Sequence, residues 1–136
     1  MTEPETTEAG AATGGVRIML RFEGLALFVL ALMLYASAGL SWWLFVVLFL
    51  APDLSFLGYL AGSKVGALIY NIAHDTALPV LLVIGGYFLR SEPEVLAIAL
   101  IWLAHIGLDR ALGFGLKYAA GFRFTHLGVL KGWAKG

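Results

Sequence analysis

PEVLAIALIWLAHIGLDRALGFGL, residues Pro93–Leu116, decides the fold class because it is long and apolar enough to cross a bilayer. A membrane-spanning helix needs about 20 mostly apolar residues. Besides Glu94 at its start, the segment contains three ionisable side chains well inside its apolar run, His105, Asp109 and Arg110. Ionisable groups are costly inside a membrane, and they usually face the interior of a helix bundle. The segment therefore predicts a membrane span and a polar site within it.

Three other segments meet the same criterion, near Val16–Ala38, Ser41–Ala61 and Lys64–Leu89. The 136-residue chain is 60% hydrophobic and 13% charged, with a mean hydropathy of +0.88. A soluble domain is about 45–50% apolar and about 25% charged, so the lipid bilayer is the expected partner of this chain. Because the connections are short, consecutive helices are expected to be antiparallel neighbours. The predicted fold class is all-α, a four-transmembrane-helix up-down bundle.

Lys and Arg residues in the short flanking segments indicate the orientation, because positively charged loops remain in the cytoplasm. Nearly all of them lie on the side of the two termini, and the opposite side has only Arg90. Both termini are therefore expected to be cytoplasmic. Three regions follow: a disordered acidic tail (residues 1–15), the transmembrane domain (16–116) and a basic, aromatic interfacial segment (117–136).

Charge and cysteine content exclude several functions. The formal net charge is zero, so bulk electrostatics predicts no nucleic-acid partner. The chain has no Cys, which excludes disulfides, thiolate metal sites and cysteine nucleophiles.

Five ionisable residues inside the four segments converge in depth: Glu23, Asp53, His74, His105 and Asp109. At a rise of 1.5 Å per residue, they lie roughly 9–15 Å from the cytoplasmic ends of their helices. His105 and Asp109 are four residues apart and share one helix face. By the same spacing, Asn71, His74 and Asp75 are expected to share another face. Each helix can thus direct its polar side chains toward the bundle interior.

Two prolines adjoin this polar layer. Pro52 directly precedes Asp53, and Pro79 lacks the N–H that the carbonyl of Asp75 would otherwise accept. We expect the helices to be broken or kinked at both places. Broken helices are tolerated in a membrane where they are buried or line a cavity.

The charges of the layer do not balance. Four acids, Glu23, Asp53, Asp75 and Asp109, accompany one permanent cation, Arg110. An Asp, Lys or Arg at the bilayer centre costs roughly 2.5–3.5 kcal/mol on insertion scales. The acids that Arg110 does not neutralise must be protonated, hydrated or bound to a cation. This imbalance favours a functional site over a structural salt bridge.

A divalent metal site accounts for most of these residues. Imidazole and carboxylate ligands suit Zn²⁺, Mn²⁺ or Fe²⁺, and a bound cation lowers the pKa of water to create a nucleophile. Glu23 or Asp75 is the expected general base or ligand-orienting group, and Arg110 is expected to receive a phosphate or carboxylate of a small or lipid-like substrate. The expected metal ligands are Asp53, His74, His105 and Asp109.

Three alternatives remain open. A haem between His74 and His105 needs only two imidazoles at matching depth, but it leaves the carboxylates unexplained. A proton- or cation-coupled transporter would use the acids as a relay, and a chain this small would act as an oligomer such as a homodimer. The small residues of GLALFVLAL suit the close helix contacts that such an oligomer needs. In the third alternative, His and Asp pair across helices only to stabilise the bundle.

Several stretches of the sequence resemble a known family. APDLSFLGYLAGSKVGALIYN, AHDTALP, WLAHIGLDRALGFGLKY and GFRFTHLG are similar to a small bacterial membrane family, domain of unknown function 4260, from Arg21 to Gly128. The resemblance implies a four-helix protein of the bacterial inner membrane. More distantly, Pro52-Asp53, His74 and the His105/Asp109 pair resemble elements of predicted membrane-bound metal-dependent hydrolases. That family usually has a second acid where this chain has Leu54-Ser55, and a further His in place of the AHDT motif.

Overall fold

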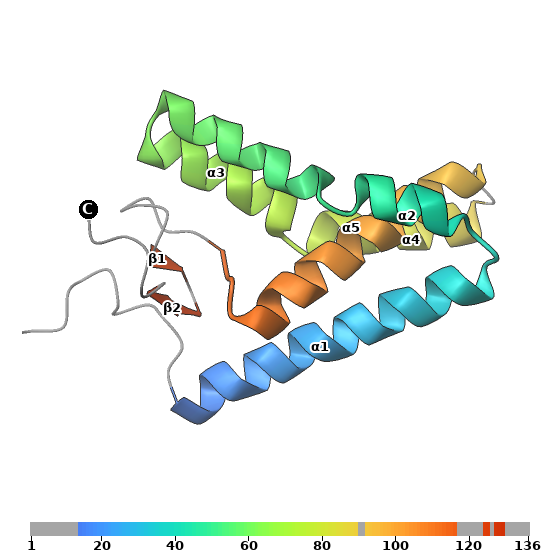
Figure 1. Cartoon of the computed structure of the whole chain (residues 1–136), viewed down its shortest axis with the longest axis horizontal. Coiled ribbons are helices and arrows are strands. Elements are labelled where there is room, and N and C mark those ends of the chain that lie inside the picture. The colour runs from blue at the N-terminus through green and yellow to red at the C-terminus, as the bar shows by residue number, and fades with distance from the viewer. Residues whose placement is uncertain (1–13, 90–91, 117–123, 126, 130–136) are drawn as a thin grey trace, which may run out of the picture.

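A computed structural model describes residues 14–89, 92–116, 124–125 and 127–129 (Figure 1). These residues form mainly helices, one of them a 3₁₀ helix (η1), with one pair of two-residue strands. The elements in chain order are α1 (Gly14–Ser37), α2 (Trp42–Leu48), η1 (Ala51–Ala61), α3 (Ser63–His74), α4 (Ala77–Phe88), α5 (Pro93–Leu112), β1 (Phe124–Thr125) and β2 (Gly128–Val129).

Among the described residues, four helical segments are long and apolar enough to cross a membrane: Gly14–Ser37, Trp42–Ala61, Ser63–Phe88 and Pro93–Leu112. They coincide with the four predicted spans to within a few residues. Only the last is half buried within the protein, whereas the second has no buried residue in its most apolar stretch. Large apolar side chains therefore cover the outside, as expected of a protein whose solvent is hydrocarbon.

The fourth span ends earlier than its apolar sequence predicts. We expected it to reach Leu116, but α5 ends at Leu112. Gly113 has a φ of 94°, in the left-handed region, and its N–H donates to the carbonyls of Arg110 and Asp109. A glycine in this conformation closes the last turn of a helix and satisfies its free carbonyls.

Both predicted helix breaks are confirmed. The second span changes from the α2 helix to the 3₁₀ helix η1, whose first turn contains Pro52. The third span is interrupted at Asp75, which is extended with φ −79° and ψ 139°. Pro79 lies in the first turn of α4, where a missing N–H costs nothing.

The most extensive helix contact joins the first and last spans, α1 and α5, which lie side by side in Figure 1. Glycines allow this approach. A Cβ added to Gly24 would lie 2.8 Å from the backbone nitrogen of Ala111, and one added to Gly107 would lie 2.6 Å from that of Phe28. α5 also contacts α4 and supplies most of the buried core.

η1 and α3 pack closely against each other. η1 contacts α5 at only a few positions. In Figure 1, the beginning of α1, the connection between η1 and α3, and the end of α5 lie at the same end of the molecule. Residues 1–13 and most of 117–136, to which we assigned a tail and an interfacial segment, lie outside the described residues. Within the latter segment, Phe124–Thr125 pairs antiparallel with Gly128–Val129.

Candidate metal centre

The four predicted metal ligands converge from three elements. Asp53 lies in the first turn of η1, His74 is the last residue of α3, and His105 and Asp109 lie one turn apart on α5. Each offers one ligand atom, and these four atoms all lie within 4.8 Å of one another. The site thus joins the η1–α3 pair to α5.

The nitrogen–oxygen and nitrogen–nitrogen distances in this group are similar, while the two carboxylate oxygens lie within 4.8 Å of each other. His74 Nε2 lies 3.3 Å from Asp53 Oδ1 and 3.4 Å from Asp109 Oδ2. His105 Nε2 lies 3.1 Å and 3.2 Å from the same two oxygens. The two Nε2 atoms are 3.3 Å apart.

These separations match the ligand spacing around a four-coordinate cation. Zinc binds imidazole nitrogen and carboxylate oxygen at about 2.0–2.2 Å, and a regular tetrahedron with bonds of that length has edges of about 3.3–3.6 Å. Charge-assisted N–H···O⁻ hydrogen bonds are shorter, about 2.7–2.9 Å. The His–Asp distances therefore fit shared coordination, and those to Asp53 also meet the criteria of hydrogen bonds.

Proton counting leads to the same conclusion. His74 Nδ1 lies 2.9 Å from the carbonyl oxygen of Tyr70, which can only accept, so Nδ1 carries a proton. In the neutral imidazole, Nε2 then presents a lone pair to the site. Each Nε2 carries at most one proton, yet it faces two carboxylate oxygens and the other imidazole nitrogen. Protons alone cannot satisfy all these contacts, whereas a cation satisfies them together.

The break after α3 exposes backbone carbonyls that α5 satisfies. In a continuous helix the N–H groups of Ala77 and Leu78 would bond the carbonyls of Ala73 and His74. Here the Ala77 N–H donates to Asp75 Oδ1 at 2.6 Å instead. The indole N–H of Trp102 donates to the Ala73 carbonyl, and Arg110 Nη2 donates to the His74 carbonyl at 3.2 Å.

These two hydrogen bonds hold the end of α3 against α5, the helix that carries His105 and Asp109. Trp102 precedes His105 by one turn, and Arg110 follows Asp109 directly. The position of His74 is therefore set by the same helix as His105 and Asp109. Groups that orient metal ligands in this way typically affect metal affinity.

Aromatic rings enclose the imidazoles. The Tyr70 ring stacks on His74 with a centroid distance of 3.8 Å and an interplanar angle of 11°. Phe56 in turn stacks on the Tyr70 ring, with a centroid distance of 5.1 Å. Phe49 meets His105 edge-on at 5.4 Å, and the backbone of Phe49 also interacts with this imidazole. His105 Nδ1 is buried and has no hydrogen bond of good geometry among the described residues.

The carboxylates form the open side of the site. The side chains of His74 and His105 are 4% and 2% exposed, whereas those of Asp53 and Asp109 are 34% and 19% exposed. A water molecule or a substrate would therefore reach a bound cation past Asp53.

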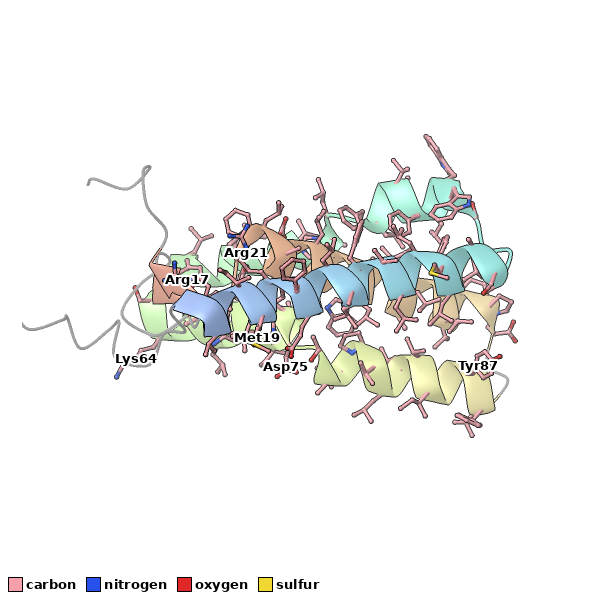
Figure 2. The ribbon with its side chains drawn as sticks, turned by 90° about the horizontal axis from the view of Figure 1, so that it is seen from below. Arg17, Met19, Arg21, Lys64, Asp75 and Tyr87 are labelled. Carbon is pink, nitrogen blue, oxygen red and sulfur yellow. The ribbon has the colours of Figure 1, made fainter. Side chains whose placement is uncertain are left out.

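The other three predicted site residues are not part of this ligand group. Asp75 lies beside the beginning of α4 (Figure 2). It is extended after the end of α3, and its Oδ1 accepts a hydrogen bond from the N–H of Ala77. Glu23 lies on α1 and lines a hollow that it shares with Arg110 and Thr76. Arg110 spans the two regions, since its guanidinium also bonds the His74 carbonyl. Their catalytic roles remain predictions.

Sequence reasoning did not select Tyr70 or Trp102. Tyr70 contacts the imidazole of His74 and Trp102 bonds the backbone of Ala73, but neither is a candidate ligand, so ligand spacing cannot identify them. Their only sequence signals are weak: Tyr70 precedes His74 by four residues, and Trp102 precedes His105 by three.

The described residues together define a small helical protein with four potential membrane spans and a partly buried His/Asp group able to hold a metal ion. Residues 17–130 match the sequence model described as Domain of unknown function (DUF4260), and the chain belongs to this family. No curated protein and no solved structure matches the chain. The more distant likeness to metal-dependent hydrolases thus finds no support in these comparisons.

Proposed function

We propose that the protein binds one divalent metal ion, preferably Zn²⁺, through Asp53, His74, His105 and Asp109. The observation that carries this proposal is the set of 3.1–3.4 Å separations among their ligand atoms. The orientation of His74 by the Tyr70 carbonyl supports it, because ligating imidazoles usually donate their other N–H to a fixed acceptor.

The proposed activity is hydrolysis of a membrane-associated substrate. A divalent cation held by Asp53, His74, His105 and Asp109 would lower the pKa of an added water ligand and so supply a hydroxide nucleophile near neutral pH. Hydrolysis adds the hydroxyl of water to the acyl or phosphoryl group and its proton to the leaving oxygen. The exposed carboxylate side supports this activity, since it leaves a path by which water and substrate could reach a fifth ligand position.

The proposed setting is the bacterial inner membrane, with an up-down bundle and both termini in the cytoplasm. Arg17, Arg21 and Lys64 lie toward one end of the molecule and Tyr87 lies at the other, which supports this orientation under the positive-inside rule (Figure 2). The metal site would then lie in the cytoplasmic half of the bundle.

The alternatives receive less support from the geometry. In a haem site the macrocycle would lie between the two Nε2 atoms, but the oxygens of Asp53 and Asp109 occupy that region. A cation relay remains compatible with the same four ligands, because a transported ion also needs a binding site. A relay predicts ion flux through liposomes, which a hydrolase does not.

Zinc titration of the purified protein in detergent tests the metal proposal. Asp109→Asn keeps the side-chain shape but removes an anionic ligand, so we expect the zinc affinity to fall by more than about 100-fold, beyond the usual effect of an orienting group. Glu94→Gln in the first turn of α5 is the matched control, because Glu94 lies at the far end of that helix. Equal affinities of the wild type and Asp109→Asn would refute the site.

A hydrolysis assay tests the activity separately. Short-chain carboxylic and phosphoric esters are incubated with the zinc-loaded protein, and turnover is expected to stop on chelation and in Asp109→Asn. Metal binding without turnover, combined with proton- or voltage-driven zinc flux in liposomes, would contradict the hydrolase proposal and support a transporter.

A further inference from the structure

A polar hollow between α1 and the α3–α4 break is not explained by the metal centre. It has a volume of about 270 Å³ and opens to the outside of the molecule. Its apolar walls include Leu20 and Leu27 of α1 and Val80 of α4, and its polar groups are Glu23, Thr76 and Arg110.

Arg110 contributes unused hydrogen-bonding capacity to this hollow. A guanidinium has five N–H donors in a planar fork. One of them bonds the His74 carbonyl, and Arg110 makes no other hydrogen bond within the described part of the chain. The fork geometry matches the oxygens of a phosphate or carboxylate.

Glu23 contributes the opposite charge from another wall. It is exposed on α1, and among the described residues it has no hydrogen bond and no ion pair within 4.0 Å, including with Arg110. A carboxylate within a membrane span is costly unless a cationic or hydrogen-bonding group accompanies it. Arg110 also interacts electrostatically with the carboxylates of Asp75 and Asp109, whereas Glu23 makes no direct ion pair with it. The hollow therefore presents separated charges of both signs.

We propose that this hollow binds a zwitterionic aminoalkyl phosphate group, with its phosphate at Arg110 and Thr76 and its ammonium at Glu23. Separated charges of both signs favour a ligand with the complementary pair over an anion or a cation alone. The apolar walls suit the alkyl parts of such a ligand. The inference rests on the proposed function, because it identifies the substrate class of the adjacent metal centre, one residue away along α5.

Calorimetric titration of the full chain in dodecyl maltoside tests this site, with a chelator present so that metal binding does not contribute. The ligands are dihexanoyl phosphatidylethanolamine, the anionic dihexanoyl phosphatidylglycerol and free phosphoethanolamine. We expect the wild type to bind the ethanolamine lipid at least about tenfold more tightly than the glycerol lipid, since a hydrogen-bonded charged partner is worth about that much. Free phosphoethanolamine binding as tightly as the lipid would identify a soluble source, and weaker binding would identify the membrane lipid.

Variants assign the preference to the two charges. Glu23→Gln should remove the discrimination between the two lipids, while the control Glu94→Gln should retain it. Arg110→Lys should weaken the binding of both lipids equally, because it keeps the positive charge but loses the planar set of N–H donors. A wild type without preference, or a Glu23→Gln protein that retains it, would overturn the inference. Zinc affinity is measured independently, so loss of the metal site and loss of the zwitterion site give different results.

Discussion

At the scale of single residues, the candidate ligands depend on neighbours that bind no metal themselves. His74 is fixed by three contacts: the Tyr70 ring stacks on its imidazole, the Tyr70 carbonyl accepts a hydrogen bond from its Nδ1–H, and Arg110 donates a hydrogen bond to its carbonyl. Trp102 holds the carbonyl of the preceding residue, Ala73. Such positioning compensates for a helix that ends at the site, where hydrogen bonds along the helix no longer hold the backbone.

Removing the Trp102 N–H should therefore weaken metal binding. Trp102→Phe leaves the Ala73 carbonyl without its donor, and we expect the zinc affinity to fall about 10–100-fold, the usual effect of changing a group that orients ligands. Competition with a chromophoric chelator measures the affinity, and the visible spectrum of the Co²⁺-substituted protein reports any change in ligand geometry.

Trp43→Phe is the control, because Trp43 is 76% exposed on α2. It should leave both readouts unchanged. A Trp102→Phe protein with wild-type affinity and spectrum would show that the indole does not position His74.

At the scale of elements, glycines determine how closely α1 and α5 approach. Gly24→Ala and Gly107→Ala each place a Cβ under 3 Å from backbone atoms of the other helix, which cannot move aside. We expect each substitution to lower the free energy of unfolding by about 1–3 kcal/mol, the usual cost of overpacking. Denaturant titration in mixed micelles measures the change.

Gly85→Ala on α4 is the matched control. An added Cβ there meets nothing within 4 Å, so the substitution should leave stability unchanged or raise it by up to about 1 kcal/mol through helix propensity. Equal losses at Gly85 and Gly107 would show that the close helix contact does not determine stability.

The elements also show what the sequence could predict. Hydropathy located the four spans, and the positions of Pro52 and Pro79 located both breaks. The pattern of Asn71, His74 and Asp75 assumed a continuous helix, so it placed Asp75 on the site face, whereas the break turns it toward Ala77. Spacing reveals side chains that share a face, but it cannot reveal which backbone carbonyls another helix will satisfy.

At the scale of the whole molecule, orientation in the membrane determines which leaflet can supply a substrate. Fusion of a reporter that is active only in the cytoplasm should give activity at the C-terminus, because the basic residues favour that side. The same reporter inserted at Gly39, in the turn between α1 and α2, should be inactive. The opposite pair of results would reverse the orientation and place the site near the outer leaflet.

The four-ligand metal centre is the central claim, because the proposed activity depends on it. X-ray absorption at the zinc K-edge of the zinc-loaded protein measures its ligands most directly. We predict about four nitrogen or oxygen ligands at about 2.0–2.2 Å, with the scattering of two imidazoles that disappears in a His74→Ala, His105→Ala double variant. A shell of six oxygen ligands without imidazole scattering, unchanged in the double variant, would contradict the account.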